Sequence, residues 1–309
     1  MMKIRIGTRG SRLAMWQANY VADLLKKNGA ETEIVAIKTT GDKVLNVSIA
    51  KIGSKGVFTE EIEAALATGD IDIAVHSAKD MPSELPEGFE LIAFSEREPA
   101  HDVLVSHLQN VDWSRPDEHV VVGTSSTRRK ALLKHFYPHV KTAEIRGNLQ
   151  TRIQKMKDGA CHALLLAYAG VHRMGYHDMV IHKFPLEQFV PAVGQGSIAV
   201  EVHRQLPDDK TAFVRKAVNH KLTEILLTAE RGYLKRLQGG CSIPVFALAD
   251  YDNGQIQLEA GIISLDGQRL IKTQHRDKPE NALTLGLEVA ETVLSSGGAA
   301  ILHEIKENL

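Results

Sequence analysis

The chain has 309 residues, 43% hydrophobic and 24% charged, which is long enough for two or three globular domains. Lysine plus arginine (37) balances aspartate plus glutamate (38), which excludes a general polyanion binder such as a DNA-coating protein. The N-terminal apolar run is too short for a signal peptide, and no apolar stretch of about 18 residues or more follows it. We therefore expect a cytoplasmic protein with no nucleic acid or membrane partner.

The first part of the chain alternates strands with helices. A strand at residues 4–6 leads through Gly7 and Arg9 into a helix, with Ser11 as a suitable N-cap and Gly29 as its end. Further strands at residues 34–37 and 71–75 flank a helix at residues 59–67. This alternation is typical of βαβ units and predicts a parallel sheet.

The same order then recurs. A strand at residues 120–122 leads through Gly123-Thr124-Ser125-Ser126 into a helix that carries Arg128 and Arg129. The following elements are a strand at 141–145, a helix at 149–157 and a strand at 163–167. The recurrence predicts two similar α/β domains, related by topology and not by a tandem repeat of sequence.

From about residue 217 the pattern changes. A long amphipathic helix at residues 222–237 is followed by three predicted strands, at 245–249, 256–263 and 270–274, with hairpin turns between them. Helices at 281–294 and at the C-terminus complete the chain. The pattern predicts a small α+β domain with a three-stranded antiparallel sheet.

Three predicted helix starts carry arginine beside small polar residues. Free backbone N–H groups and the helix dipole favour negative charge there, and a guanidinium can hold a carboxylate with two parallel hydrogen bonds. The residues concerned are Arg9 and Ser11; Ser125, Ser126, Arg128 and Arg129; Arg146 and Arg152. At one such start, a serine that only caps and a solvated arginine would be the better interpretation. Three starts in a neutral chain favour a ligand with several separated anionic groups.

A polar loop follows the strand at residues 71–75. It contains Lys79 and Asp80, at the strand end where open α/β sheets place their ligands. These two side chains could orient a substrate, transfer protons or stabilise a developing cation. The alternative is a solvated ion pair worth under about 1 kcal/mol, and position alone does not decide between them.

Two glycine-containing loops do not have the spacing of nucleotide-binding motifs. Residues 51–56 form a basic loop without the GxxxxGK[ST] spacing, which is better interpreted as a mobile lid carrying Lys51 and Lys55. Residues 191–196 differ from a GxGxxG fingerprint, and we interpret them as a hinge that returns the chain between domains.

The two cysteines have different surroundings. Cys241 follows two glycines, which leave its thiol uncrowded, as a nucleophile or an attachment point requires. A small buried cysteine is the alternative, and it is the interpretation we prefer for Cys161. The 14 histidines have no partner at metal-ligand spacing, since Pro138 interrupts the helix that would align His135 with His139. We predict no metal site.

Taken together, these segments resemble the porphobilinogen deaminases (hydroxymethylbilane synthases). The resemblance covers essentially the whole chain in family order, and its short motifs are specific in combination. They are residues 4–9, 50–58, 76–82, 123–129, 146–152, 191–196 and 239–241.

The resemblance implies a reaction and a cofactor. Four porphobilinogens would be joined head to tail, with loss of ammonia, on a dipyrromethane primer held by a thioether to Cys241, and hydrolysis would release linear hydroxymethylbilane. Asp80 matches the catalytic aspartate, which would stabilise cationic azafulvene and pyrrole nitrogens. Each pyrrole carries an acetate and a propionate, which agrees with the arginine-bearing helix starts. The family also suggests a monomer.

The resemblance further implies domains and binding residues. It suggests two periplasmic-binding-protein-like α/β domains, at residues 1–96 with 197–216 and at 97–196, and a cysteine-bearing domain at 217–309. Lys51, Lys55 and Phe58 match the lid, in which Ser54 replaces a usual glycine. The implied cofactor- and substrate-binding residues are Arg9, Ser11, Ser77, Lys79, Thr124, Ser125, Ser126, Arg128, Arg129, Arg146, Gly147, Arg152 and Gln195.

Two other functions remain as alternatives. A non-catalytic two-lobed module that binds a polycarboxylate would share the anion-binding helix starts. It would give Cys241 no role, and it predicts an export signal. A cysteine-nucleophile acyl transferase would need a histidine base near Cys241, and the sequence nominates none.

Overall fold

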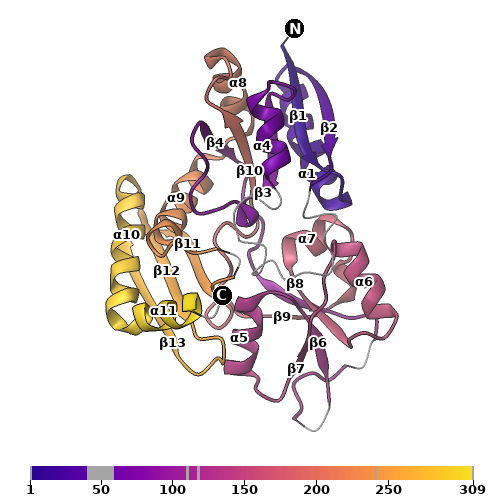
Figure 1. Cartoon of the computed structure of the whole chain (residues 1–309), viewed down its shortest axis with the longest axis vertical. Coiled ribbons are helices and arrows are strands. Elements are labelled where there is room, and N and C mark those ends of the chain that lie inside the picture. Colours follow the sequence, from indigo (N-terminus) through magenta and orange to yellow (C-terminus); the bar gives the residue numbers. More distant parts are fainter. Residues whose placement is uncertain (1, 40–58, 109–110, 117–118, 241, 308–309) are drawn as a thin grey trace. The chain divides into compact units, whose positions relative to one another are not determined.

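The computed structural model describes residues 2–39, 59–108, 111–116, 119–240 and 242–307. The chain divides into two compact units, Met1–Glu98 with Gly196–Ile225 and Pro99–Gln195 with Leu226–Leu309. Each unit holds a five-stranded sheet, and the second unit holds a further three-stranded sheet (Figure 1). The division of the second unit into two domains stays a prediction.

The sheet of the first unit has the strand order β2-β1-β3-β10-β4. Its strands are β1 (Lys3–Arg9), β2 (Glu31–Ile37), β3 (Ile73–Ser77), β4 (Phe89–Phe94) and β10 (Ile198–His203). Apolar residues of α1 (Arg12–Lys27) and α8 (Asp208–Val218) pack on one face, and those of α4 (Glu60–Ala67) pack on the other. Both faces are therefore covered, as a largely parallel sheet requires.

The sheet of the second unit repeats this arrangement, with the order β7-β6-β8-β5-β9. Its strands are β5 (Asp102–Val105), β6 (Val121–Gly123), β7 (Lys141–Ala143), β8 (Ala163–Ala167) and β9 (Val180–Lys183). The associated helices are α5 (Thr127–Phe136), α6 (Leu149–Lys157) and α7 (Tyr168–Arg173). The equivalent strand orders confirm the predicted duplication of topology.

The expectation of a parallel sheet was wrong for one strand of each unit. In the first unit β10 runs antiparallel to β3 and β4, and in the second β5 runs antiparallel to β8 and β9. Each of these strands is the first that the chain forms after it passes from the other unit. A strand that enters in this way has no preceding βαβ crossover to fix its direction.

The third sheet is antiparallel in the order β11-β12-β13, as predicted. Its elements are β11 (Val245–Asp252), β12 (Gln255–Ile263), β13 (Leu270–Asp277), α9 (Lys221–Arg236), α10 (Ala282–Val293) and α11 (Ala299–Glu307). Helix α10 packs on β12 and β13 (Figure 1). The helical run Pro279–Glu307 is long and apolar enough to cross a membrane by length and composition. Leu285, Val289 and Val293 are buried on α10, and 39% of the apolar window is buried within the protein.

Candidate functional site

Two predicted site residues follow strands that end at the same edge of the first sheet. Strands β1 and β3 are parallel neighbours, so Arg9 at the end of β1 and Asp80 after β3 belong to the carboxyl edge. Ser11 is the N-cap of α1, and its Oγ accepts a hydrogen bond of 3.2 Å from Ala14 N. The predicted cap is confirmed.

A short turn carries Asp80. Residues Ala78–Asp80 form the 3-10 helix η1, in which Met81 N donates to Ala78 O at 3.3 Å. Ala78 N donates to Ser197 O at 3.0 Å, which joins the turn to the segment entering β10. Ala78 is buried, whereas Asp80 is exposed. The turn is therefore anchored through its backbone and presents the Asp80 carboxylate to solvent.

Ser77, at the end of β3, contacts a residue that the sequence did not single out. Gln17 Nε2 lies 2.9 Å from Ser77 Oγ, and Gln17 is only 2% exposed. A glutamine within the amphipathic pattern of α1 gave no sign of this contact. The amide joins α1 to the strand that precedes the Asp80 turn.

In the second unit, side chains pack closely on the backbone at Gly123, where the chain leaves β6 for α5. A Cβ on Gly123 would lie 2.6 Å from Ile145 and 2.7 Å from Cys161 Sγ, so this position requires glycine. Cys161 is buried, and burial raises the pKa of its thiol, in keeping with the structural role expected for it. Ser126 caps α5 by accepting a 3.4 Å hydrogen bond from Arg129 N.

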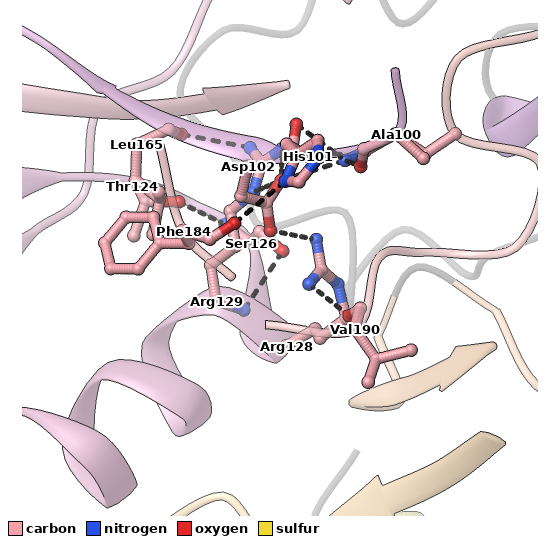
Figure 2. A network of polar contacts seen from close by, with 11 residues as sticks. Ala100, His101, Asp102, Thr124, Ser126, Arg128, Arg129, Leu165, Phe184 and Val190 are labelled. Atoms are coloured by element: carbon pink, nitrogen blue, oxygen red, sulfur yellow. Dashed lines mark hydrogen bonds and ion pairs between the residues drawn. The ribbon is translucent and has the colours of Figure 1, made fainter. Parts of the chain in front are cut away.

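Arg128 and Arg129 both bind the carboxylate of Asp102, at the start of β5 (Figure 2). Arg128 Nη2 donates to Asp102 Oδ2 at 2.7 Å, and Nη1 donates to Val190 O at 2.8 Å. Arg129 donates to Asp102 Oδ1 from Nε at 3.1 Å and from Nη2 at 2.7 Å, and to Leu165 O from Nη1 at 3.0 Å. Asp102 has no exposed surface, and the arginines are 5% and 6% exposed.

Gln195 completes this cluster. Its Nε2 donates to Ala100 O at 2.6 Å and to Asp102 Oδ1 at 3.0 Å, and the residue is 1% exposed. Burial alone would raise the pKa of Asp102, but Arg128, Arg129 and Gln195 outweigh burial and hold that pKa well below its ordinary value. The carboxylate is therefore ionised, and two guanidinium groups against one carboxylate leave a formal charge of +1 in the cluster.

The third helix start is more exposed. Asn148 caps α6, since its Oδ1 accepts a 2.9 Å hydrogen bond from Thr151 N. Arg152 Nε donates to Gly147 O at 2.7 Å, and Arg146 Nε lies 3.4 Å from Glu144 Oε2. Gly147 has φ of +118°, a conformation that glycine adopts without strain. The Arg146 side chain is 29% exposed, so it is accessible to a ligand beside the N-terminus of α6.

Several predicted residues lie outside the described part of the chain: the cysteine Cys241 and the lid residues Lys51, Ser54, Lys55 and Phe58. Among the described residues, no group of three or more His, Cys, Asp or Glu could hold a metal ion. Sequence reasoning missed Asp102, whose only signal is one acidic residue directly before the apolar run Val103-Leu104-Val105.

Comparison with known proteins gives a consistent result along the chain. Residues 4–212 match the family model "Porphobilinogen deaminase, dipyromethane cofactor binding domain", and residues 225–295 match "Porphobilinogen deaminase, C-terminal domain". Among solved structures, the chain is similar to a double mutant of the VFT2 domain of Bordetella pertussis BvgS. That likeness has 16% identity and a TM-score of 0.43, over 70% of this chain and 85% of the other.

The curated relatives are much closer. A porphobilinogen deaminase of Desulfosudis oleivorans is 56% identical over 99% of this chain and 99% of its own length. One of Cytophaga hutchinsonii is 51% identical over 99% and 98%, and one of Syntrophomonas wolfei is 45% identical over 99% and 100%. The chain therefore belongs to the porphobilinogen deaminase family of enzymes.

Proposed function

We propose that the protein is a transferase that joins four porphobilinogens head to tail, with loss of ammonia at each step, and releases hydroxymethylbilane by hydrolysis. The observation that carries the proposal is the match to both family domains, over residues 4–212 and 225–295. The family description supplies a dipyrromethane cofactor, which when bound offers the pyrrole carbon to which the first substrate is joined.

The donor groups of the second unit fit a cofactor that bears carboxylates. The cluster of Arg128, Arg129 and Asp102 keeps one uncompensated positive charge behind the start of α5. Ser125 lies in the same turn and is only half-buried. A carboxylate bound here would be favoured by this charge and by the α5 dipole. Arg146 and Arg152 would bind further carboxylates, and Cys241 would hold the cofactor covalently.

Asp80 is assigned to the chemistry in the first unit. Its exposed carboxylate, on a turn with a fixed backbone, would stabilise the positive charge that develops on the substrate pyrrole as ammonia leaves. Arg9, Ser11 and Lys79, at the same sheet edge, would orient the substrate carboxylates. We also infer that the protein acts in the cytoplasm as a monomer, with porphobilinogen as its small-molecule partner.

The covalent cofactor gives the decisive test. The intact mass of the denatured protein should exceed that of the polypeptide by two linked pyrroles, and Cys241→Ala should lack this excess. Cys161→Ala is the matched control and should keep it, since Cys161 is a buried structural thiol. A wild-type mass equal to the bare polypeptide, unchanged after incubation with porphobilinogen, would contradict the proposal and favour a polycarboxylate-binding module.

A second prediction concerns Asp80. Asp80→Ala should lose nearly all turnover while its circular dichroism and unfolding midpoint stay unchanged, because an exposed side chain contributes little to stability. Asp80→Glu should be far milder, because it keeps the charge and only shifts its position. Turnover is measured as porphobilinogen consumed by protein that carries the expected extra mass. Near-normal turnover of Asp80→Ala would refute the role of the carboxylate.

A further inference from the structure

Three ionisable residues lie between α4 and the sheet of the first unit, where apolar residues would be expected. Ala199 pairs with His76 and Glu201 pairs with Ala74, so His76 and Glu201 are diagonal neighbours on one face of β3 and β10. Ala74 packs against Ile62 and Leu66 of α4, which identifies this face as the one that α4 covers.

These side chains are deeply buried and poorly satisfied. Nε2 of His76 lies 3.0 Å from Oε2 of Glu201, and the two side chains are 6% and 0% exposed. The contact lacks the direction of a hydrogen bond, and within the described residues this nitrogen and both Glu201 oxygens have no hydrogen-bond partner. Glu63 of α4 is 7% exposed, and its Oε1 is likewise unpartnered there.

Burying these ionisable groups costs free energy that an apolar contact in the same place would not cost. Replacing buried ionic groups by apolar residues of similar volume is often neutral or stabilising. Residues that violate the packing rules in this way occur mostly at functional sites. The position of the cluster in the chain indicates which site it serves.

His76 stands four residues before Asp80, on the strand that leads into the Asp80 turn. The other side of this strand end is held by Gln17, which contacts Ser77 at 2.9 Å. Opposite the step from Val200 to Glu201, β4 has one extra residue, Ile92. Such bulges redirect side chains and are frequent beside active sites. Glu201 is thus placed beside the strand end that His76 occupies.

The charge of the cluster is set by its two carboxylates and one imidazole. Two carboxylates and one imidazole carry a charge of −2 when all are deprotonated, a state that a buried site disfavours strongly. Burial raises the pKa of Glu63, and the Glu201 carboxylate raises it further, whereas a hydrogen bond with Thr59 and the His76 imidazole lower it; the net direction is upward. Charged groups at the margin are Glu60, which also raises that pKa, and Arg9, which the β1–β3 register places on the same face as His76. Glu63 therefore retains its proton to a higher pH than an isolated carboxylate would.

We propose that Glu201 and His76, with Glu63, form a proton-holding cluster whose charge state positions the Asp80 turn. While Glu63 holds its proton, α4 and β10 stay together across the end of β3. Loss of the proton from Glu63 sets two carboxylates, on α4 and β10, against each other and displaces that strand end. The cluster touches neither substrate nor cofactor, so its members are positioning residues. The inference rests on the proposed role of Asp80.

Two variants test it in steady-state assays of protein that carries the expected extra mass. Glu201→Gln should lower kcat by about 10- to 100-fold with KM nearly unchanged, as displaced catalytic groups do. Glu63→Gln keeps the His76–Glu201 pair and cannot acquire the second negative charge. Its kcat should therefore persist to higher pH, with the alkaline fall moved up by about one unit. The matched control is Glu90→Gln on β4, an exposed partner of Arg204 whose profile should equal that of the wild type.

The outcomes separate this inference from the proposed function. A Glu63→Gln profile that superimposes on the wild-type profile would refute the proton-holding cluster, and so would a kcat of Glu201→Gln within twofold of wild type. If Glu201→Gln fails to fold, the Glu63→Gln profile alone decides. An intact mass equal to that of the bare polypeptide would instead refute the proposed function. Full turnover of Asp80→Ala would refute the catalytic role of Asp80, which the cluster is proposed to support.

Discussion

At Asp102, a carboxylate with no exposed surface accepts hydrogen bonds from Arg128, Arg129 and Gln195. The arginines were predicted as ligand-binding groups from their place at a helix start, and that role stays a prediction. In the structure both guanidinium groups already bind an internal anion, the Asp102 carboxylate, so any ligand binding depends on this pair. Without that carboxylate, two buried like charges would repel each other.

Asp102→Asn should therefore destabilise the protein strongly. Removing one partner from a buried ion pair typically costs about 3 to 5 kcal/mol. Because the folded-state pKa of Asp102 lies below its ordinary value of 3.8, its contribution is present above that value and lost as pH falls below it. Urea unfolding at several pH values should show a deficit at neutral pH that narrows in acid. Asp178→Asn, at an exposed position, is the control, and a constant deficit at all pH values would contradict the prediction.

At the scale of elements, helix N-caps set the positions of the candidate binding residues. Ser11, Ser126 and Asn148 each accept a hydrogen bond from the first turn of α1, α5 and α6. The caps fix where each helix begins, and so they fix the directions of Arg128 on α5 and Arg152 on α6. Both helices follow parallel strands, β6 and β7, whose carboxyl ends share one sheet edge.

Asn148→Ala should lower the free energy of unfolding by about 0.5 to 2 kcal/mol, because Thr151 N and Oγ1 both lose their acceptor, Asn148 Oδ1. Asn148→Asp should retain most of the stability, since its carboxylate accepts the same hydrogen bonds and interacts favourably with the helix dipole. Urea unfolding midpoints of the three proteins provide the comparison. Equal losses in both variants would show that the cap does not stabilise α6.

At the scale of the whole molecule, the two α/β sheets have equivalent strand orders, and each receives one antiparallel strand after the chain passes from the other unit. The segment at residues 191–196, expected to be a hinge, ends where the chain re-enters the first unit at Gly196. Gly196 has φ of +99°, and a Cβ there would lie 2.3 Å from Glu98 O, so only glycine fits.

Local pattern in the sequence determined much of this protein. Helix α6 and strand β8 have the predicted bounds, and Ser11 is the N-cap that side-chain chemistry predicted, because periodicity and capping depend on neighbours in the chain. The strands β4, β5, β9 and β10 were missed, since a few apolar residues do not distinguish a buried strand from other apolar segments.

Tertiary structure alone decided which polar groups meet. Asp102 reaches Arg128 across 26 residues, Gln17 reaches Ser77 across 60, and Glu201 reaches His76 between strands that are distant in the sequence. No local rule selects these partners, because each pair exists only after the sheet order is set. Burial then gives them their importance, since an ionised group shut away from water must find its counter-charge within the fold.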